Sequence, residues 1–182
     1  WASLKERNIV KLTQNYFADN IEKLIRHTAI PINNFNSLTF MALCEHVAKE
    51  NGTRVIYIGD GADEIFGGYK RHADVSENYK KNKQLDTILL SKNYFTLDRM
   101  KLFDNSDIDH LNDRKKLYQD IENESDDINK TLINDQMTFL QGYLLRADQI
   151  GMKYGQEIRA PFCDERIISF VNSISGNLKI NF

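Results

Sequence analysis

The chain has 182 residues, of which 41% are hydrophobic and 27% charged, with 9 glycines and 2 prolines. This composition excludes collagen-like, proline-rich and low-complexity proteins, and a chain of this length can bury about 70% of its unfolded surface. Its 24 basic and 26 acidic residues give a net charge of −2. Neither nucleic acid nor a membrane surface is therefore expected as a partner, and no apolar run approaches the ~20 residues of a membrane span.

Two features at the chain level bear on compartment and completeness. The two cysteines, Cys44 and Cys163, are interpreted as free thiols, and no signal peptide is visible, so we expect a cytoplasmic protein. The chain begins with Trp1 rather than Met, which favours a fragment of a longer protein. We expect one domain over residues 1–182.

The first elements are predicted as amphipathic helices. Apolar residues recur at three- and four-residue spacing from Ile9 to Ile25, and a turn is predicted at Ile30-Pro31 because proline disfavours helix at the residue before it. A second helix is predicted to begin with Ser37 as its N-cap and to end at Asn51-Gly52.

One strand is predicted, over Val55–Ile58, because the segment is β-branched, aromatic and apolar on both faces. A loop is predicted over 59–64. A lone strand leaves its backbone groups without partners. Either a second strand escapes the pattern or the strand joins a sheet supplied by residues outside the chain, and we favour the second explanation.

The remaining elements are predicted as helices, which gives an α/β fold class that is mostly helical. Residues of about 73–130 are predicted as a hydrophilic, helical inserted region with many acids over 104–127. The segment Lys70-Arg71-His72 before it is interpreted as an exposed helix start rather than an anion-binding group. Apolar spacing returns from Leu132 to Leu144, and a last helix is predicted from Glu165 to Ile174.

Three acidic residues, Asp60, Asp63 and Glu64, follow the predicted strand. In open α/β sheets ligands bind beyond the carboxyl ends of strands. Carboxylates on a tight glycine-containing loop suit Mg²⁺, a cation that takes oxygen ligands and bridges phosphates. Asp63 or Glu64 as the cap of the next helix explains the same spacing equally well. Spacing alone leaves both interpretations open.

Two motifs carry a resemblance to a known family. The eleven residues Gly59–Tyr69, GDGADEIFGGY, resemble the signature G-(E/D)-G-(A/S)-D-E-(L/V/I)-F-G-G-Y of the glutamine-dependent asparagine synthetases. Further along, Leu144–Asp148 with Met152, followed by Glu157–Asp164 (EIRAPFCD), is similar to that family's LL(R/K)xD…M…ExRxPFLD segment. Residues 75–130 match least.

The resemblance implies a fold, a reaction and a site. The fold is an ATP-pyrophosphatase-type (adenine nucleotide alpha hydrolase-like) parallel-sheet domain, of which this chain is a predominantly helical fragment. The reaction activates a carboxylate, aspartate in asparagine synthetases, with ATP and Mg²⁺ as an acyl-adenylate, and ammonia from glutamine then forms the amide. The implied partners are these small molecules, with a homodimer of the full-length protein. The implied site residues are the catalytic Asp60 and Glu64, the Mg²⁺ ligand Asp63, and the cofactor-binding Gly59, Gly61 and Arg146.

The second motif leaves further choices open. For Glu157 and Arg159 a structural ion pair is favoured over substrate contact. Arg146 fits a phosphate or carboxylate contact, or a pair with an acid on its own helix, equally well. Three residues depart from the family pattern: Gln149 replaces a basic residue, Gly151 replaces a small hydroxyl or Ala, and Cys163 replaces Leu.

The sequence also lacks parts of the family's active site. The phosphate-binding SGGxDS loop, the glutaminase domain and the basic KxxLR segment have no counterpart, so we expect no turnover by the 182-residue chain alone. Two alternatives to asparagine synthesis remain. One is a related amidotransferase, including β-lactam- and macrolactam-forming enzymes. The other is a non-catalytic module, which the changes at Gln149 and Gly151 motivate and the retained acidic residues oppose.

Overall fold

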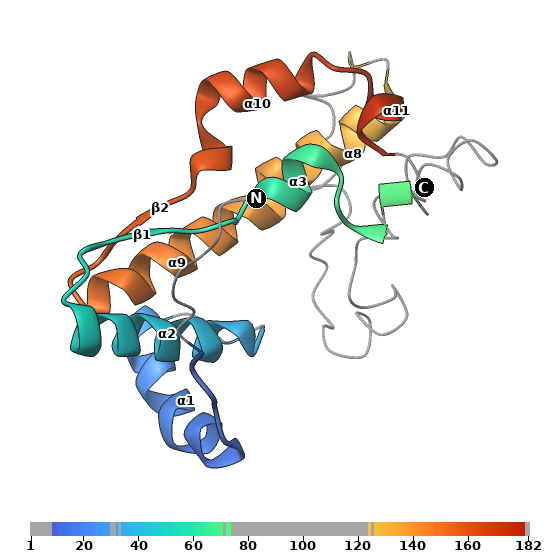
Figure 1. Cartoon of the computed structure of the whole chain (residues 1–182). Coiled ribbons are helices and arrows are strands. Elements are labelled where there is room, and N and C mark those ends of the chain that lie inside the picture. The colour runs from blue at the N-terminus through green and yellow to red at the C-terminus, as the bar shows by residue number, and fades with distance from the viewer. Residues whose placement is uncertain are drawn as a thin grey trace, which may run out of the picture. The chain divides into compact units, whose positions relative to one another are not determined.

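The computed structural model describes residues 9–29, 34–70, 72–73 and 126–180, together with Ile32 and Glu124 (Figure 1). Most of the predicted inserted region therefore lies outside the described residues, as do Ile30 and Pro31. Contacts divide the chain into two compact units. Trp1–Ile58 with Gly142–Pro161 form what we call the sheet unit, and Gly59–Gln141 with Phe162–Phe182 form the helical unit. No helix in the described part is long and apolar enough to cross a membrane.

The sheet unit begins with two helices, α1 (Gln14–Thr28) and α2 (Asn36–Asn51). Helix α1 starts later than its apolar pattern because the Thr13 hydroxyl accepts a hydrogen bond from the Tyr16 amide and caps the first turn. The prediction of Ser37 as the cap of α2 is wrong. Ser37 is buried within the helix, and the Asn34 side chain accepts the Asn36 amide instead.

A parallel two-stranded sheet completes the sheet unit. Strand β1 (Val55–Tyr57) confirms the predicted strand, and it pairs with β2 (Glu157–Arg159) in a register that sets Ile56 against Ile158. The favoured explanation of a partner outside the chain is therefore wrong for this pairing, because β2 lies within the chain. Strand β2 escapes the pattern because its three residues alternate charged, apolar, charged and give no apolar run. Helix α9 (Gln141–Lys153) precedes it. The core is formed by residues of α1, α2 and α9: Leu24, Leu38, Met41, Cys44 and Ile150.

The helices of the described part of the helical unit are short (Figure 1). Helix α8 (Asp127–Asp135) continues into the π-helical turn η1 (Gln136–Leu140), and a single turn of 3-10 helix, η2 (Pro161–Cys163), leads to α10 (Glu165–Asn172) and α11 (Gly176–Lys179). Helix α3 (Ala62–Phe66) begins inside the segment 59–64 predicted as a loop, so that prediction is wrong from Ala62 onward. Nor do Asp63 and Glu64 cap it, because the N-cap position belongs to Gly61.

The carboxylate of Asp126 joins two of these helices. One oxygen accepts the amides of Ile128 and Asn129 at the start of α8, and the other accepts the Gly176 amide at 2.7 Å and the Ser175 hydroxyl. Partial burial acts to raise the pKa of Asp126, but these hydrogen bonds outweigh it and lower the pKa below its usual value. A single side chain therefore satisfies orphan amides at two helix N-termini.

Candidate active site

Glycines define both ends of the short helix that carries the acidic residues. Gly61 precedes α3 with φ of +94°, and a Cβ there would lie 2.5 Å from the Cys163 sulfur. Gly67 ends α3 with φ of +79°, and its amide donates to the Asp63 carbonyl at 2.9 Å. Both conformations strain other residues, so these glycines are explained by the backbone itself. The predicted cofactor residue Gly59 is exposed, and a Cβ there would meet nothing within 4 Å, whereas Gly61 is buried.

The three predicted carboxylates lie in three different environments. Asp63 is exposed on the first turn of α3, and Asp60 is half-buried in the preceding turn. Glu64 is only 2% exposed, and its Oε1 accepts a hydrogen bond of 2.8 Å from the Tyr69 hydroxyl. The side chains of Asp63 and Asp60 are therefore accessible at the surface, whereas Glu64 is held inside the unit.

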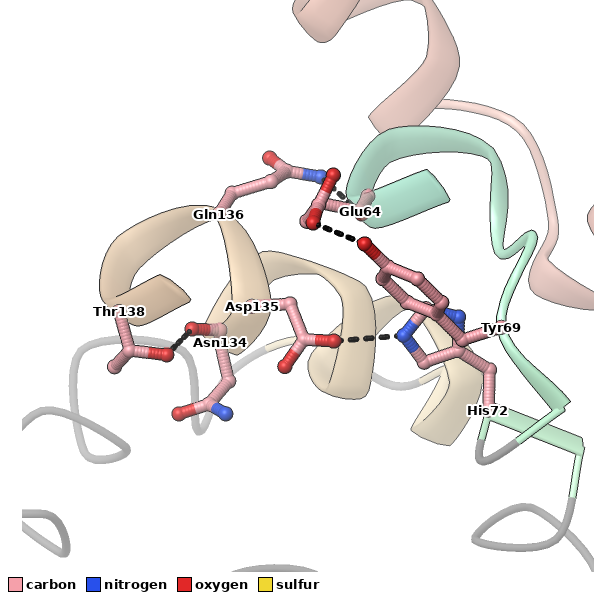
Figure 2. A network of polar contacts seen from close by, with 7 residues as sticks. All are labelled: Glu64, Tyr69, His72, Asn134, Asp135, Gln136 and Thr138. Atoms are coloured by element: carbon pink, nitrogen blue, oxygen red, sulfur yellow. Dashed lines mark hydrogen bonds and ion pairs between the residues drawn. The ribbon is translucent and has the colours of Figure 1, made fainter. Parts of the chain in front are cut away.

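A buried histidine continues this polar network (Figure 2). His72 Nε2 lies 2.7 Å from Asp135 Oδ2, with both side chains fully buried, and the His72 ring lies 5.4 Å from the Tyr69 ring. The exposed helix start predicted around His72 is therefore wrong for this residue. The sequence does contain a signal that Asp135 is buried. Its spacing from Ile128 and Leu132 places it on the apolar face of α8.

The π-helical turn adds a second connection to α3. Gln136 Nε2 lies 3.4 Å from the Glu64 carbonyl, and Gln136 and Asn172 exchange two amide hydrogen bonds of 3.2 and 3.1 Å. The end of α8, helix α3 and helix α10 thus meet at one polar centre. π-helical turns frequently occur at functional sites.

Cys163 lies beside the acidic loop. Its thiol donates to the Asp60 carbonyl at 3.5 Å, and burial, together with the charges of Glu64 and Asp60, raises its pKa. The sulfur is thus a packing group and a weak donor rather than a reactive thiolate. The Cys163 sulfur, which stands where the family pattern has Leu, occupies the space next to Gly61.

The carboxylates of the described residues do not by themselves form a complete metal site. Among the described residues, no group of three or more His, Cys, Asp and Glu side chains could hold a metal ion. Mg²⁺ is usually bound through one or two carboxylates, with substrate phosphates and waters completing the octahedron. The exposed carboxylate of Asp63 suits one such ligand position.

The second motif contributes to both units. In the sheet unit, Arg159 Nε pairs with Glu157 at 2.8 Å, which confirms the predicted ion pair. The Arg146 guanidinium lies 5.0 Å from the centre of the Tyr143 ring, and its role toward phosphate or carboxylate stays a prediction. In the helical unit, Asp164 caps α10, and hydrogen bonds from the Arg166 side chain and amide lower the pKa of Asp164 to about 2.

Two of the residues that depart from the family pattern, Gly151 and Gln149, lie in the sheet unit. A Cβ on Gly151 would lie 2.5 Å from Ile158 Cγ1 and 3.0 Å from the Gln156 carbonyl, so the glycine permits close packing of α9 against β2. The Gln149 carbonyl accepts a hydrogen bond of 2.8 Å from His27 Nε2. The change at Gly151 therefore has a packing explanation.

Comparisons with known proteins agree with the motifs. The sequence matches the family described as asparagine synthase over residues 4–181. It is 24% identical over 139 residues to a Methanocaldococcus jannaschii protein named "Putative asparagine synthetase (glutamine-hydrolyzing) 1", covering 76% of this chain and 18% of that protein. It is 34% identical over 62 residues to "Amidase chyE" of Penicillium rubens, covering 34% of this chain and 9% of that protein.

The chain thus spans less than a fifth of either curated relative. No solved structure matches it. The family match covers nearly the whole chain, and it includes both motifs whose geometry is described above. The chain belongs to the asparagine synthase family.

Proposed function

We propose that the protein activates a carboxylic acid with MgATP as an acyl-adenylate and then forms an amide. Aspartate is the first candidate acid, and ammonia from glutamine is the first candidate amine. The family is ATP-dependent in general and of ligase type, which supports this chemistry. The proposal includes an ATP-pyrophosphatase-type parallel sheet, of which β1 and β2 are a part.

The observation that carries the proposal is the placement of Asp63 and Asp60. Asp63 is an exposed carboxylate on a glycine-bounded helix start, where it would hold Mg²⁺. The metal supplies charge neutralisation for the pyrophosphate leaving group. Asp60, half-buried one turn earlier, is suited to accept the proton that the attacking amine loses.

A related amide-forming reaction is the second candidate. The Penicillium relative is named an amidase, a name that refers to chemistry at an amide bond. A non-catalytic module is less well supported. One of the two sequence changes that suggested it, the glycine at position 151, has a packing explanation.

The test is ATP–pyrophosphate exchange by the longest natural form of the protein, with Mg²⁺ and a panel of carboxylic acids. Exchange that depends on aspartate supports asparagine synthesis. Exchange that depends on another acid supports the activation step with a different substrate, and so favours the second candidate function. Absence of exchange across the panel would contradict the proposed function.

A further inference from the structure

Among the described residues of the helical unit, two carboxylates are buried, and each has a hydrogen-bond partner near the end of the acidic motif. Glu64 is 2% exposed and Asp135 0% exposed. Burying a carboxylate costs free energy unless hydrogen bonds compensate it, so such groups need partners that are held in place. Tyr69 and His72 supply hydrogen bonds to Glu64 and Asp135, respectively.

Tyr69 and His72 are themselves coupled. The His72 amide donates to the Tyr69 carbonyl at 2.9 Å, and the two rings lie 5.4 Å apart (Figure 2). One side chain of this turn reaches Glu64 on α3, and the other reaches Asp135 at the end of α8. We call Tyr69 and His72 together the clamp, because their side chains connect α3 to α8.

Helix α3 depends on such contacts for its orientation. It has only five residues, far fewer than an isolated helix needs to be stable, and a glycine lies at each end. Its inward side chains are Glu64 and Ile65, and its exposed acidic side chain is Asp63. A rotation of α3 that released Glu64 would therefore also displace Asp63.

We propose that His72 and Asp135 are positioning residues that act through Tyr69 and Glu64 to fix α3, and with it Asp63 and Asp60. The proposal rests on the proposed function for the chemistry that is positioned. It assigns Glu64 to the anchor of α3 rather than to the reacting groups. Buried polar pairs generally add little net stability, and a role in holding one geometry accounts for this pair better.

The test uses Tyr69→Phe, which removes one hydroxyl, Asp135→Asn, which replaces the carboxyl group with an amide, and the double variant. Asn129→Ala is the matched control, because Asn129 is a buried polar residue of α8 that bonds toward Asn172, Ile174 and Lys179. All variants are made in the longest natural form and compared at a temperature where each is folded. The readouts are amide hydrogen exchange over residues 62–68 and the Mg²⁺ dependence of ATP–pyrophosphate exchange.

We expect both single variants to lose about tenfold in protection over residues 62–68, with the Asn129→Ala variant unchanged there. The catalytic rate falls about tenfold or the Mg²⁺ requirement rises by a similar factor. The double variant loses no more than the worse single variant, because both act through one path.

Unchanged protection in folded Tyr69→Phe and Asp135→Asn variants would overturn the clamp, whether or not the protein catalyses exchange. Lost protection with unchanged kinetics, or equal kinetic loss in the Asn129→Ala variant, would overturn the positioning role. If the natural protein shows no exchange with any acid, the proposed function fails and so does the positioning role, while hydrogen exchange still decides whether the clamp holds α3.

Discussion

Gly151 illustrates, at the scale of one residue, how a departure from a family pattern has a local cause. The position is helical and buried, and Ile158 occupies the space that a Cβ would need. Sequence alone suggests a degenerate site here, because the contact joins a helix to a strand that the apolar pattern does not reveal.

Gly151→Ala is expected to destabilise the protein by about 1–3 kcal/mol, since the added methyl overpacks against Ile158 and the Gln156 carbonyl. Gly142→Ala in the same helix is the control, because nothing lies within 4 Å of its added Cβ. That variant should gain up to about 1 kcal/mol from helix propensity. Urea denaturation measures both.

Adding Ile158→Ala to the Gly151→Ala variant should make the two changes non-additive, because the truncated side chain leaves room for the new methyl. Equal stability changes in the Gly151→Ala and Gly142→Ala variants would show that Ile158 does not restrict the position.

The individual site residues were predictable only in part. Adjacent residues carry the acidic motif, so the sequence brings Asp60, Asp63 and Glu64 together without knowledge of the fold. Burial then separates them, because Glu64 faces inward while Asp63 faces out. The His72–Asp135 pair joins positions 63 residues apart, and no local pattern predicts that contact.

At the scale of elements, Asp126 connects α8 to α11 through hydrogen bonds from both helix starts. Its folded-state pKa is lowered, so its contribution is fully present above its ordinary pKa of 3.8 and is lost as the pH falls through the lower folded-state value. The charged form is the form that caps both helices.

Asp126→Ala is expected to cost about 1 kcal/mol or more near neutral pH, because two helices lose cap hydrogen bonds. The stability gap between this variant and the natural protein should narrow as the pH falls from about 5 toward about 2. Urea denaturation at several pH values measures the gap. Asp19→Ala, at an exposed position of α1, serves as the control, and a gap for Asp126→Ala that is constant with pH would contradict this account.

The elements themselves follow the sequence where local signals are strong. The apolar spacing predicts α1, α2 and α10, and β-branched residues predict β1. Strand β2 escapes prediction because its three residues give no apolar run, and helix α3 because five residues are too few to show a helical period. Tertiary contacts, including pairing with β1 and the inward side chains of α3, fix these two elements instead.

At the scale of the whole molecule, the chain passes from the sheet unit to the helical unit at each of the two motifs. The chain leaves the sheet unit after Ile58, directly before the acidic motif, and again after Pro161, within the second motif. The sheet unit carries the parallel strands, and the helical unit carries the acidic residues and the clamp. Family membership accounts for both motifs at once, which local spacing alone does not.

The central claim is that Asp63 holds the Mg²⁺ that carboxylate activation requires. The most direct measurement is ATP–pyrophosphate exchange by the Asp63→Asn variant of the longest natural form. Glu165→Gln is the matched control, because Glu165 is likewise an exposed acid on the first turn of a helix. The account predicts a loss of at least about 100-fold for Asp63→Asn and unchanged exchange for Glu165→Gln. Unchanged exchange in a folded Asp63→Asn variant would contradict it.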